Sequence, residues 1–216
     1  MHPKISKKSK PIVTDSVEFL IAEYNYIART ADQANEDRSR VSSFYLIAVG
    51  SLVAALFSTQ FLSQVFDPNT INIIFTVLFF LLTLLGASTI LQLTRLRVAW
   101  FESVVAMNHI KEFAIAKDKE LAQAFKWRTD SLPRFYKINS VSFLQTLEVA
   151  ALSSLTFGAG VFFLQKSIQY DCGTCNWAYA VSFGFLAIVF QMWNYKRQLT
   201  LEQERLQKDV DNNHAS

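Results

Sequence analysis

Four long stretches of this chain carry almost no charged residues, and this pattern constrains the fold more than any other feature. They cover residues 41–66, 68–94, 138–165 and 172–195, which are 26, 27, 28 and 24 residues long. Glu148 is the single charged residue among these 105. An α-helix needs about 20 apolar residues to cross about 30 Å of hydrocarbon. We therefore predict four transmembrane helices.

The composition agrees with a membrane protein and argues against several other classes. The chain is 51% hydrophobic and only 18% charged, which is too apolar for an ordinary soluble surface. Two cysteines are too few for a disulfide-rich secreted scaffold. The phosphate-binding, dinucleotide-binding, zinc-protease and serine-hydrolase motifs are absent from the sequence, and its three histidines are scattered. We expect a protein that is not an enzyme and that holds no cofactor or metal.

Short turns between the first two and the last two stretches favour two antiparallel hairpins. We expect an all-α, polytopic membrane protein, an antiparallel four-transmembrane-helix bundle with cytoplasmic helical extensions. The spans are predicted at 41–66, 70–94, 141–165 and 176–195, with a basic tail and amphipathic helix at 1–40, a helical loop at 95–140 and a final helix or tail at 196–216.

The distribution of basic residues predicts the orientation. Of the 21 Lys and Arg residues, 20 lie in segments 1–40, 95–137 and 196–216. Because short cytoplasmic segments carry the excess of Lys and Arg, both termini should be cytoplasmic, most simply in a bacterial inner membrane. The first apolar stretch begins only after 40 residues, so no cleavable signal peptide is expected. The four lysines before residue 11 favour contact with anionic membrane lipids, whereas interleaved acidic residues argue against nucleic-acid binding.

The segments that flank the first two spans have helical apolar stripes. A helix at about 15–39 should run directly into the first span, because neither Pro nor Gly separates them, and the second span should continue as helix to about Phe125. An apolar stripe left uncovered within its own chain must be buried elsewhere. This predicts a homo-oligomer, a cytoplasmic protein partner or a signal ligand; the alternative is that the stripes cover one another within one protomer. The expected interface residues are Tyr24, Trp100, Met107 and Ile110.

Small residues at four-residue spacing predict where membrane helices approach closely, because lipid tails provide no hydrophobic drive for helices to associate. Three such sets occur in the predicted spans: Gly50, Ala54 and Ser58; Ala150, Ser154 and Gly158; and Ala180 and Gly184.

Glu148 should lie about 10 Å below the cytoplasmic surface of the third span, at 1.5 Å per residue. A carboxylate at that depth is costly unless it is paired, protonated or exposed to water. One interpretation is an ion path or proton-linked site, and in a ring of subunits it would favour cations. The other is a protonated Glu whose hydrogen bonds fix the helix register. The expected polar neighbours are Gln145, Gln92 and Gln191.

Cys172 and Cys175 form a Cys-x-x-Cys pair at the predicted outer start of the fourth span. This pair resembles that of the vitamin K epoxide reductase type of membrane disulfide-generating enzymes, and the resemblance implies thiol oxidation coupled to a quinone. Those enzymes carry a second cysteine pair, which this chain lacks. The alternatives are a local disulfide that tightens the outer loop, or two free thiols.

The run Arg95-Leu-Arg-Val-Ala-Trp-Phe-Glu-Ser and the later Met107-Asn-His-Ile-Lys, after Glu23-Tyr-Asn-Tyr, resemble segments of uncharacterised bacterial four-span membrane proteins. The architecture also resembles membrane effectors of bacterial defence systems, in which a cytoplasmic sensor controls a membrane subunit. The intramembrane carboxylate and the cytoplasmic helical extensions together lead us to expect an oligomeric channel- or pore-forming subunit controlled through its cytoplasmic helices. A membrane scaffold that recruits a cytoplasmic partner, or a thiol oxidoreductase, are the alternatives.

Overall fold

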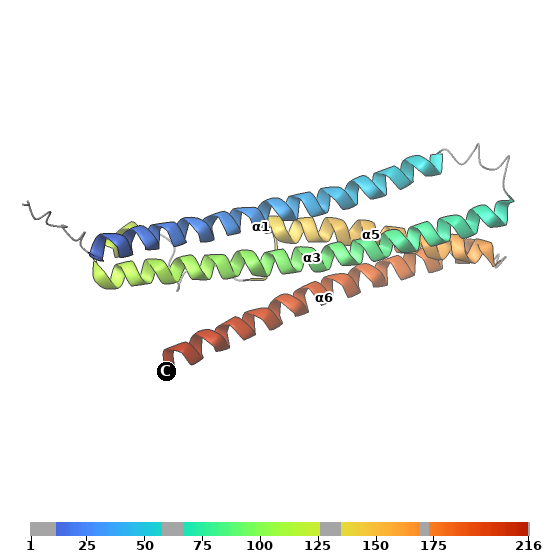
Figure 1. The fold of residues 1–216 in the computed structure, drawn as a ribbon. Helices are drawn as coiled ribbons and strands as arrows, with labels where there is room; N and C mark the ends of the chain where they lie inside the picture. The colour runs from blue at the N-terminus through green and yellow to red at the C-terminus, as the bar shows by residue number, and fades with distance from the viewer. Residues whose placement is uncertain (1–11, 58–66, 126–134, 169–172, 216) are drawn as a thin grey trace, which may run out of the picture. The chain divides into compact units, whose positions relative to one another are not determined.

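A computed structural model describes residues 12–57, 67–125, 135–168 and 173–215 of the chain. Every regular element in these ranges is helical, which confirms the all-α prediction. Four of the described helices are long and the fifth is a single short turn; the long helices are labelled in Figure 1. The helices are α1 (Ile12–Phe57), α3 (Pro68–Lys117), α4 (Leu121–Ala124), α5 (Val141–Ser167) and α6 (Thr174–Ala215).

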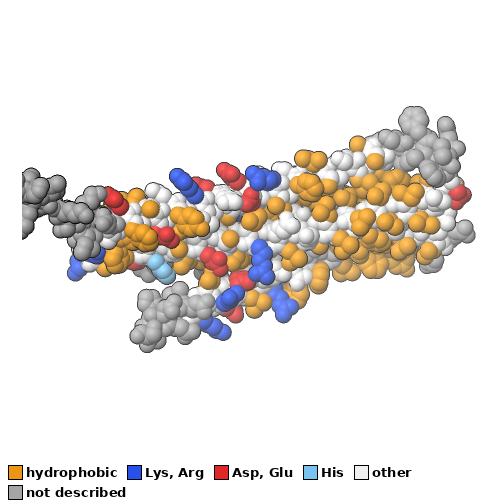
Figure 2. Space-filling model, in the orientation of Figure 1, with side chains coloured by type: hydrophobic (Ala, Val, Ile, Leu, Met, Phe, Trp, Pro, Cys, Tyr) orange, Lys and Arg blue, Asp and Glu red, His pale blue; other side chains and the backbone are white. Residues whose placement is uncertain are grey.

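The four long helices are each long and apolar enough to cross a membrane, and this supports an integral, multi-pass membrane protein. Figure 2 shows one broad area covered by hydrophobic side chains, with Lys, Arg, Asp and Glu mostly beyond it. Three of these helices, α1, α3 and α6, are 46, 50 and 42 residues long, about twice what a span requires. Helices α1, α3 and α6 therefore extend beyond the predicted spans. Where each helix enters and leaves the membrane stays a prediction.

The chain divides into two compact units, which we describe separately. Unit 1 contains Met1–Gln33 and Ala99–Leu132, and unit 2 contains Ala34–Val98 and Pro133–Ser216. Unit 2 includes all four predicted spans. Unit 1 includes the start of α1, the end of α3 and α4.

In unit 1, the prediction of one helix up to about Phe125 is wrong. Helix α3 ends at Lys117, and α4 begins only at Leu121. The Asp118 side chain causes the break, because its Oδ1 accepts a hydrogen bond from the Glu120 backbone N–H at 3.0 Å. An Asp that binds the backbone two residues later offers the chain an alternative to the helix.

In unit 2, small residues bring α5 and α6 into close contact, as their spacing predicts. A Cβ atom added at Gly158 would lie 2.7 Å from the Ala180 carbonyl oxygen, and one added at Gly184 would lie 3.1 Å from the Ser154 carbonyl oxygen. At Gly50 an added Cβ would meet nothing within 4 Å in the single chain, so a contact there stays a prediction. Ser58 lies outside the described residues.

Aromatic rings connect α3 to α5 near the predicted outer end of the spans. The ring centroid of Phe163 lies 5.2 Å from that of Phe75 and 5.6 Å from that of Phe79. One helical turn away, the Phe80 and Phe157 ring centroids are 5.9 Å apart. Because these rings pack tightly, the hydroxyl-bearing residues of the next turns are held at a fixed spacing.

Candidate functional sites

Hydroxyl and amide side chains meet between α3, α5 and α6 in the middle of unit 2. The Gln191 Nε2 atom donates to the Ser153 Oγ atom at 3.0 Å, and Ser153 Oγ donates to the Thr83 carbonyl oxygen at 3.3 Å. The Thr83 and Thr156 hydroxyl oxygens are 3.1 Å apart. We call Thr83, Ser153, Thr156 and Gln191 the inner polar cluster. It joins three helices through hydrogen bonds that membrane hydrocarbon cannot supply.

Helix α1 reaches the inner polar cluster through Tyr45, whose side chain is completely buried. The Tyr45 hydroxyl lies beside Ser153 and Thr156, but it completes no well-oriented hydrogen bond within the described part of the chain. Gly86 makes room for this approach, because a Cβ there would lie 2.8 Å from the Tyr45 hydroxyl and 2.6 Å from the Ser153 Oγ atom. A Cβ at position 86 would therefore force the helices apart.

Glu148 lies on the opposite side of α5, where its side chain is exposed. Its carboxylate makes no hydrogen bond or ion pair with any residue that the structure describes. Leu144 and Leu155 are exposed on the same side of the helix, four residues before and seven residues after it. A carboxylate thus interrupts an otherwise apolar outer face.

The polar residues expected around Glu148 have other surroundings. Gln191 belongs to the inner polar cluster, and Gln92 is exposed in a groove with Asp37 and Arg95, between α1 and α3. Gln145 is half-buried, and its Oε1 atom is buried without a hydrogen-bond partner among the described residues. None of the three is bonded to Glu148.

An apolar groove of about 520 Å³ lies between α5 and α6, and it begins one turn beyond Glu148 on the same face. Ala151 and Leu155 line it, and so do Gly158 and Gly184 where the two helices approach most closely. Trp177 and Phe162, whose ring centroids are 4.7 Å apart, line its other end. The outer face of α5 therefore combines a charged position with an open apolar groove.

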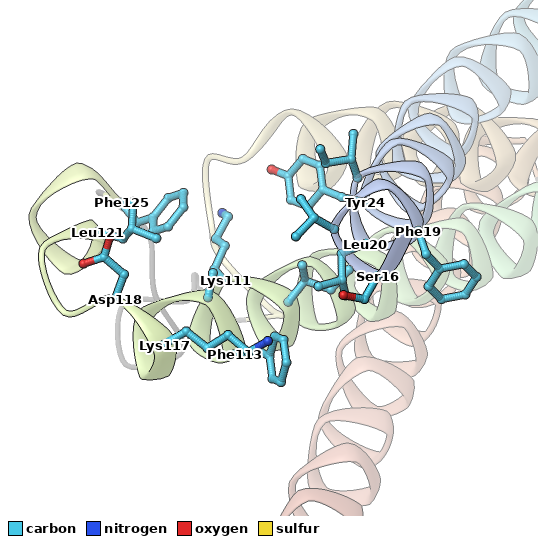
Figure 3. A pocket seen from close by; sticks show the side chains of 14 residues that line it. Ser16, Phe19, Leu20, Tyr24, Lys111, Phe113, Lys117, Asp118, Leu121 and Phe125 are labelled. Carbon is cyan, nitrogen blue, oxygen red and sulfur yellow. The ribbon is translucent and has the colours of Figure 1, made fainter. Parts of the chain in front are cut away.

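Unit 1 contains the larger groove, with a volume of about 990 Å³ (Figure 3). Figure 3 shows Leu20 and Tyr24 of α1 on one side of it, Leu121 and Phe125 on the other, and Lys111 between them. The apolar lining is largely open to solvent, since Phe19, Val17 and Ile21 are each at least half exposed. We call this the unit 1 groove.

The lining of the unit 1 groove includes two of the four residues predicted for a partner interface. Tyr24 and Ile110 line it, whereas Trp100 and Met107 are half-buried elsewhere on α3. Basic side chains lie over aromatic rings at its edge: the Lys117 Nζ atom is 4.7 Å from the Phe113 ring centroid. Such a groove fits an apolar occupant with a negatively charged end.

The cysteine pair is described only in part. Cys175 is partly exposed in the first turn of α6 and has no disulfide partner among the described residues, but Cys172 lies outside them. Their disulfide stays a prediction. In the ranges that the structure covers, no three His, Cys, Asp or Glu side chains come together as metal ligands would.

Of the inner polar cluster, the sequence singled out only Gln191, which was expected beside Glu148; Thr83, Ser153 and Thr156 were missed. Five of the nine buried residues of α5 are Ser or Thr, and their spacing on one face could have identified the cluster. Comparison with known proteins adds no further assignment, since no protein family, curated protein or solved structure matches this chain.

Proposed function

We propose that this protein is a homo-oligomeric channel subunit of a bacterial inner membrane, with Glu148 beside a cation path formed between copies. The four spans form an antiparallel bundle with both termini in the cytoplasm. One observation carries the proposal: the only charged residue of the predicted spans is exposed on the outer face of α5.

A carboxylate that faces membrane hydrocarbon is energetically costly. An ionised side chain that faces lipid at membrane depth costs about 2.5–3.5 kcal/mol on insertion scales, and its own chain offers Glu148 no partner among the described residues. A water-filled path between neighbouring copies removes that cost. A ring of carboxylates along such a path attracts cations and repels anions, so cation selectivity is expected.

The inner polar cluster supports this location for the path. Its hydroxyl and amide groups bond mainly to one another and to backbone carbonyls of their own helices. The interior of one protomer is thus closed by side chains that meet across three helices. A path through the middle of a single chain would have to break these contacts, whereas a path between chains would not.

The unit 1 groove supports control from the cytoplasm. Helices α1 and α3 each run without interruption from groove-lining residues into predicted spans. An occupant that changes the separation of the two helices at the groove therefore acts on the same helices that cross the membrane. We propose that this occupant is an amphipathic ligand or partner segment that opens or closes the path.

The decisive experiment measures cation flux from liposomes that contain the purified protein. We expect Glu148→Gln to lower flux about tenfold or more, which corresponds to about 1.4 kcal/mol in the barrier, and Glu148→Asp to retain most of it. Glu23→Gln, which removes an exposed carboxylate outside the predicted spans, is the matched control and should leave flux unchanged. Absence of flux in the wild-type protein, or equal flux in Glu148→Gln, contradicts the proposal.

A membrane scaffold is the second candidate, and the unit 1 groove favours it because the groove fits a partner helix without any need for a path. A scaffold predicts that Glu148→Gln has no effect. It also predicts that Leu20→Asp, in the groove lining, abolishes co-purification of a cytoplasmic partner.

A further inference from the structure

Two pairs of arginines mark the ends of the first two spans, and in each pair one side chain is buried and the other is exposed. On α1, Arg38 is 6% exposed, whereas the Arg40 side chain is 76% exposed and pairs with Asp37 at 3.2 Å. On α3, Arg97 is 8% exposed, whereas the Arg95 side chain is 78% exposed and pairs with Glu202 at 3.4 Å. The exposed arginines are thus neutralised at the surface, and the burial of Arg38 requires a separate explanation.

The helix register buries these two arginines. Arg38 follows Ala34 by four residues and precedes Ser42 by four, and both neighbours are buried on the same face of α1. Arg97 follows the buried Leu93 by four residues on α3. Side chains at three- and four-residue steps share a helix face, so each arginine occupies a position where the helix packs on its neighbours.

The two buried arginines lie close together beside Tyr195 of α6. Each lies near enough to the other to be repelled, and both interact with the buried Tyr195 hydroxyl. Burial lowers the pKa of both guanidiniums, and repulsion by Arg38 lowers the pKa of Arg97 further. The aromatic wall continues to Tyr136, whose ring centroid is 6.4 Å from that of Tyr195 and 5.8 Å from the Lys196 Nζ atom. We call Arg38, Arg97 and Tyr195 the arginine cluster.

Arg38 carries the argument, because its buried Nε and Nη1 atoms have no hydrogen-bond partner in the described ranges. A buried guanidinium without a counter-charge costs several kcal/mol, so a fold that places one there needs an anion to offset the cost. No carboxylate among the described residues faces it: Asp37 pairs with Arg40, and Glu202 pairs with Arg95.

We propose that the arginine cluster binds a phosphate group. A phosphate group is tetrahedral, and its oxygens can each accept more than one hydrogen bond, so it can bind two guanidinium groups at once. The Tyr195 hydroxyl supplies a further hydrogen-bond donor. Arg38 lies three residues before the first charge-free stretch, and Arg97 lies three after the second. Tyr195 is the last residue of the fourth. All three therefore lie at the predicted membrane boundary, the depth at which both phospholipid headgroups and soluble phosphate compounds occur. The inference is independent of the proposed channel activity.

The test measures the thermal unfolding of the full chain in a neutral detergent, with increasing phosphatidylglycerol, phosphatidylcholine or inorganic phosphate at constant ionic strength. A ligand at about 100 times its Kd should raise the wild-type Tm by about 5 °C. We expect Arg38→Met to remove this rise and Arg40→Met, two residues away and exposed, to keep it. On α3, Arg97→Met and Arg95→Met form the second matched pair.

A rise with phosphatidylglycerol alone assigns the site to an anionic headgroup, and a rise with inorganic phosphate assigns it to a soluble phosphate compound; either supports the proposal. A wild-type Tm that responds to none of the three overturns it, and so does a rise that Arg38→Met and Arg40→Met share. The wild-type measurement decides even if Arg38→Met fails to fold. Retention of phosphatidylglycerol by the wild type and by Arg40→Met in native mass spectrometry, with loss in Arg38→Met, would confirm a headgroup.

Discussion

The two faces of α5 show how differently one membrane helix can treat its polar residues. The inner face carries Ser153 and Thr156, whose hydroxyls bond to α3, to α6 or to their own helix. The outer face carries Glu148 between exposed leucines, with no partner among the described residues. The Ser153 and Thr156 hydroxyls are thus bonded within one chain, whereas Glu148 has no partner in the described part of it.

Two polar residues at a similar depth in the membrane can thus have very different surroundings, because they lie on different faces of the same helix. Ser153 and Glu148 are only five residues apart, and both lie inside the predicted third span. Ser153 contributes to the packing of one protomer, and we propose that Glu148 contributes to the contact between protomers. Three substitutions test this contrast on the folded protein.

The largest effect is expected where α5 and α6 approach backbone to backbone, at the floor of the groove between the two faces. Gly158→Val should lower the free energy of unfolding by about 3 kcal/mol, because the added carbons would overlap the Ala180 carbonyl, which cannot rotate away. Gly50→Val is the control, since nothing lies within 4 Å of its added Cβ. Thermal unfolding in detergent, followed by circular dichroism, compares the two. Equal losses at both positions would mean that α5 and α6 do not approach closely.

A smaller loss is expected from the inner polar cluster. Ser153→Ala removes the acceptor of the Gln191 amide and should cost about 0.6 kcal/mol, and at most about 1.7 kcal/mol, the range measured for hydrogen bonds between membrane helices. Ser51→Ala is the control, because the Ser51 hydroxyl donates only to the Ile47 carbonyl of its own helix at 2.8 Å. Unfolding in a denaturing detergent mixture measures both. If Ser153→Ala leaves the free energy of unfolding unchanged, the hydrogen bonds of the inner face do not stabilise the protomer, and the proposed difference between the two faces is wrong.

The smallest effect is expected on the outer face. Leu155 is 69% exposed, so Leu155→Ala should change the stability of a detergent-isolated protomer by no more than about 0.5 kcal/mol. If copies associate through this face, the same substitution weakens the oligomer, which size-exclusion chromatography with light scattering detects. If Leu155→Ala destabilises the protomer but leaves the oligomer intact, Leu155 packs within one protomer and not between protomers, which contradicts the prediction.

The number and type of the helices could be predicted from the sequence, because the membrane requires about 20 apolar residues per span and charges mark where each stretch ends. Local chemistry was harder to predict. Asp118 looked like one polar residue in a helical run, yet its carboxylate binds the Glu120 N–H and ends α3. The small-residue spacing correctly predicted the close approach at Gly158 and Gly184, whereas no helix of the same chain lies against Gly50. Spacing identifies a smooth helix face but not which helix, if any, packs on it.

The sequence predicts how deep in the membrane a polar side chain lies, but not on which face of its helix it lies. A span with apolar residues on all sides gives no periodicity from which to derive which face packs, so the sequence alone could not distinguish an inward from an outward Glu148. The same holds for Arg38 and Arg40, which are two residues apart at the same membrane boundary. Only the packed helices distinguish the buried one from the exposed one.

The position of Cys175 makes the protein easy to label. It is a partly exposed thiol in the first turn of α6, and the only other cysteine of the chain lies three residues before it. After mild reduction, a thiol-reactive dye that cannot cross membranes should therefore label this one segment, and only from the side of the membrane on which it lies. Labelling of the protein in intact cells would show that this segment lies outside the membrane. Because one predicted span separates it from the C-terminus and three separate it from the N-terminus, both termini would then lie inside. The molecule thus carries its own marker of orientation, without an engineered tag.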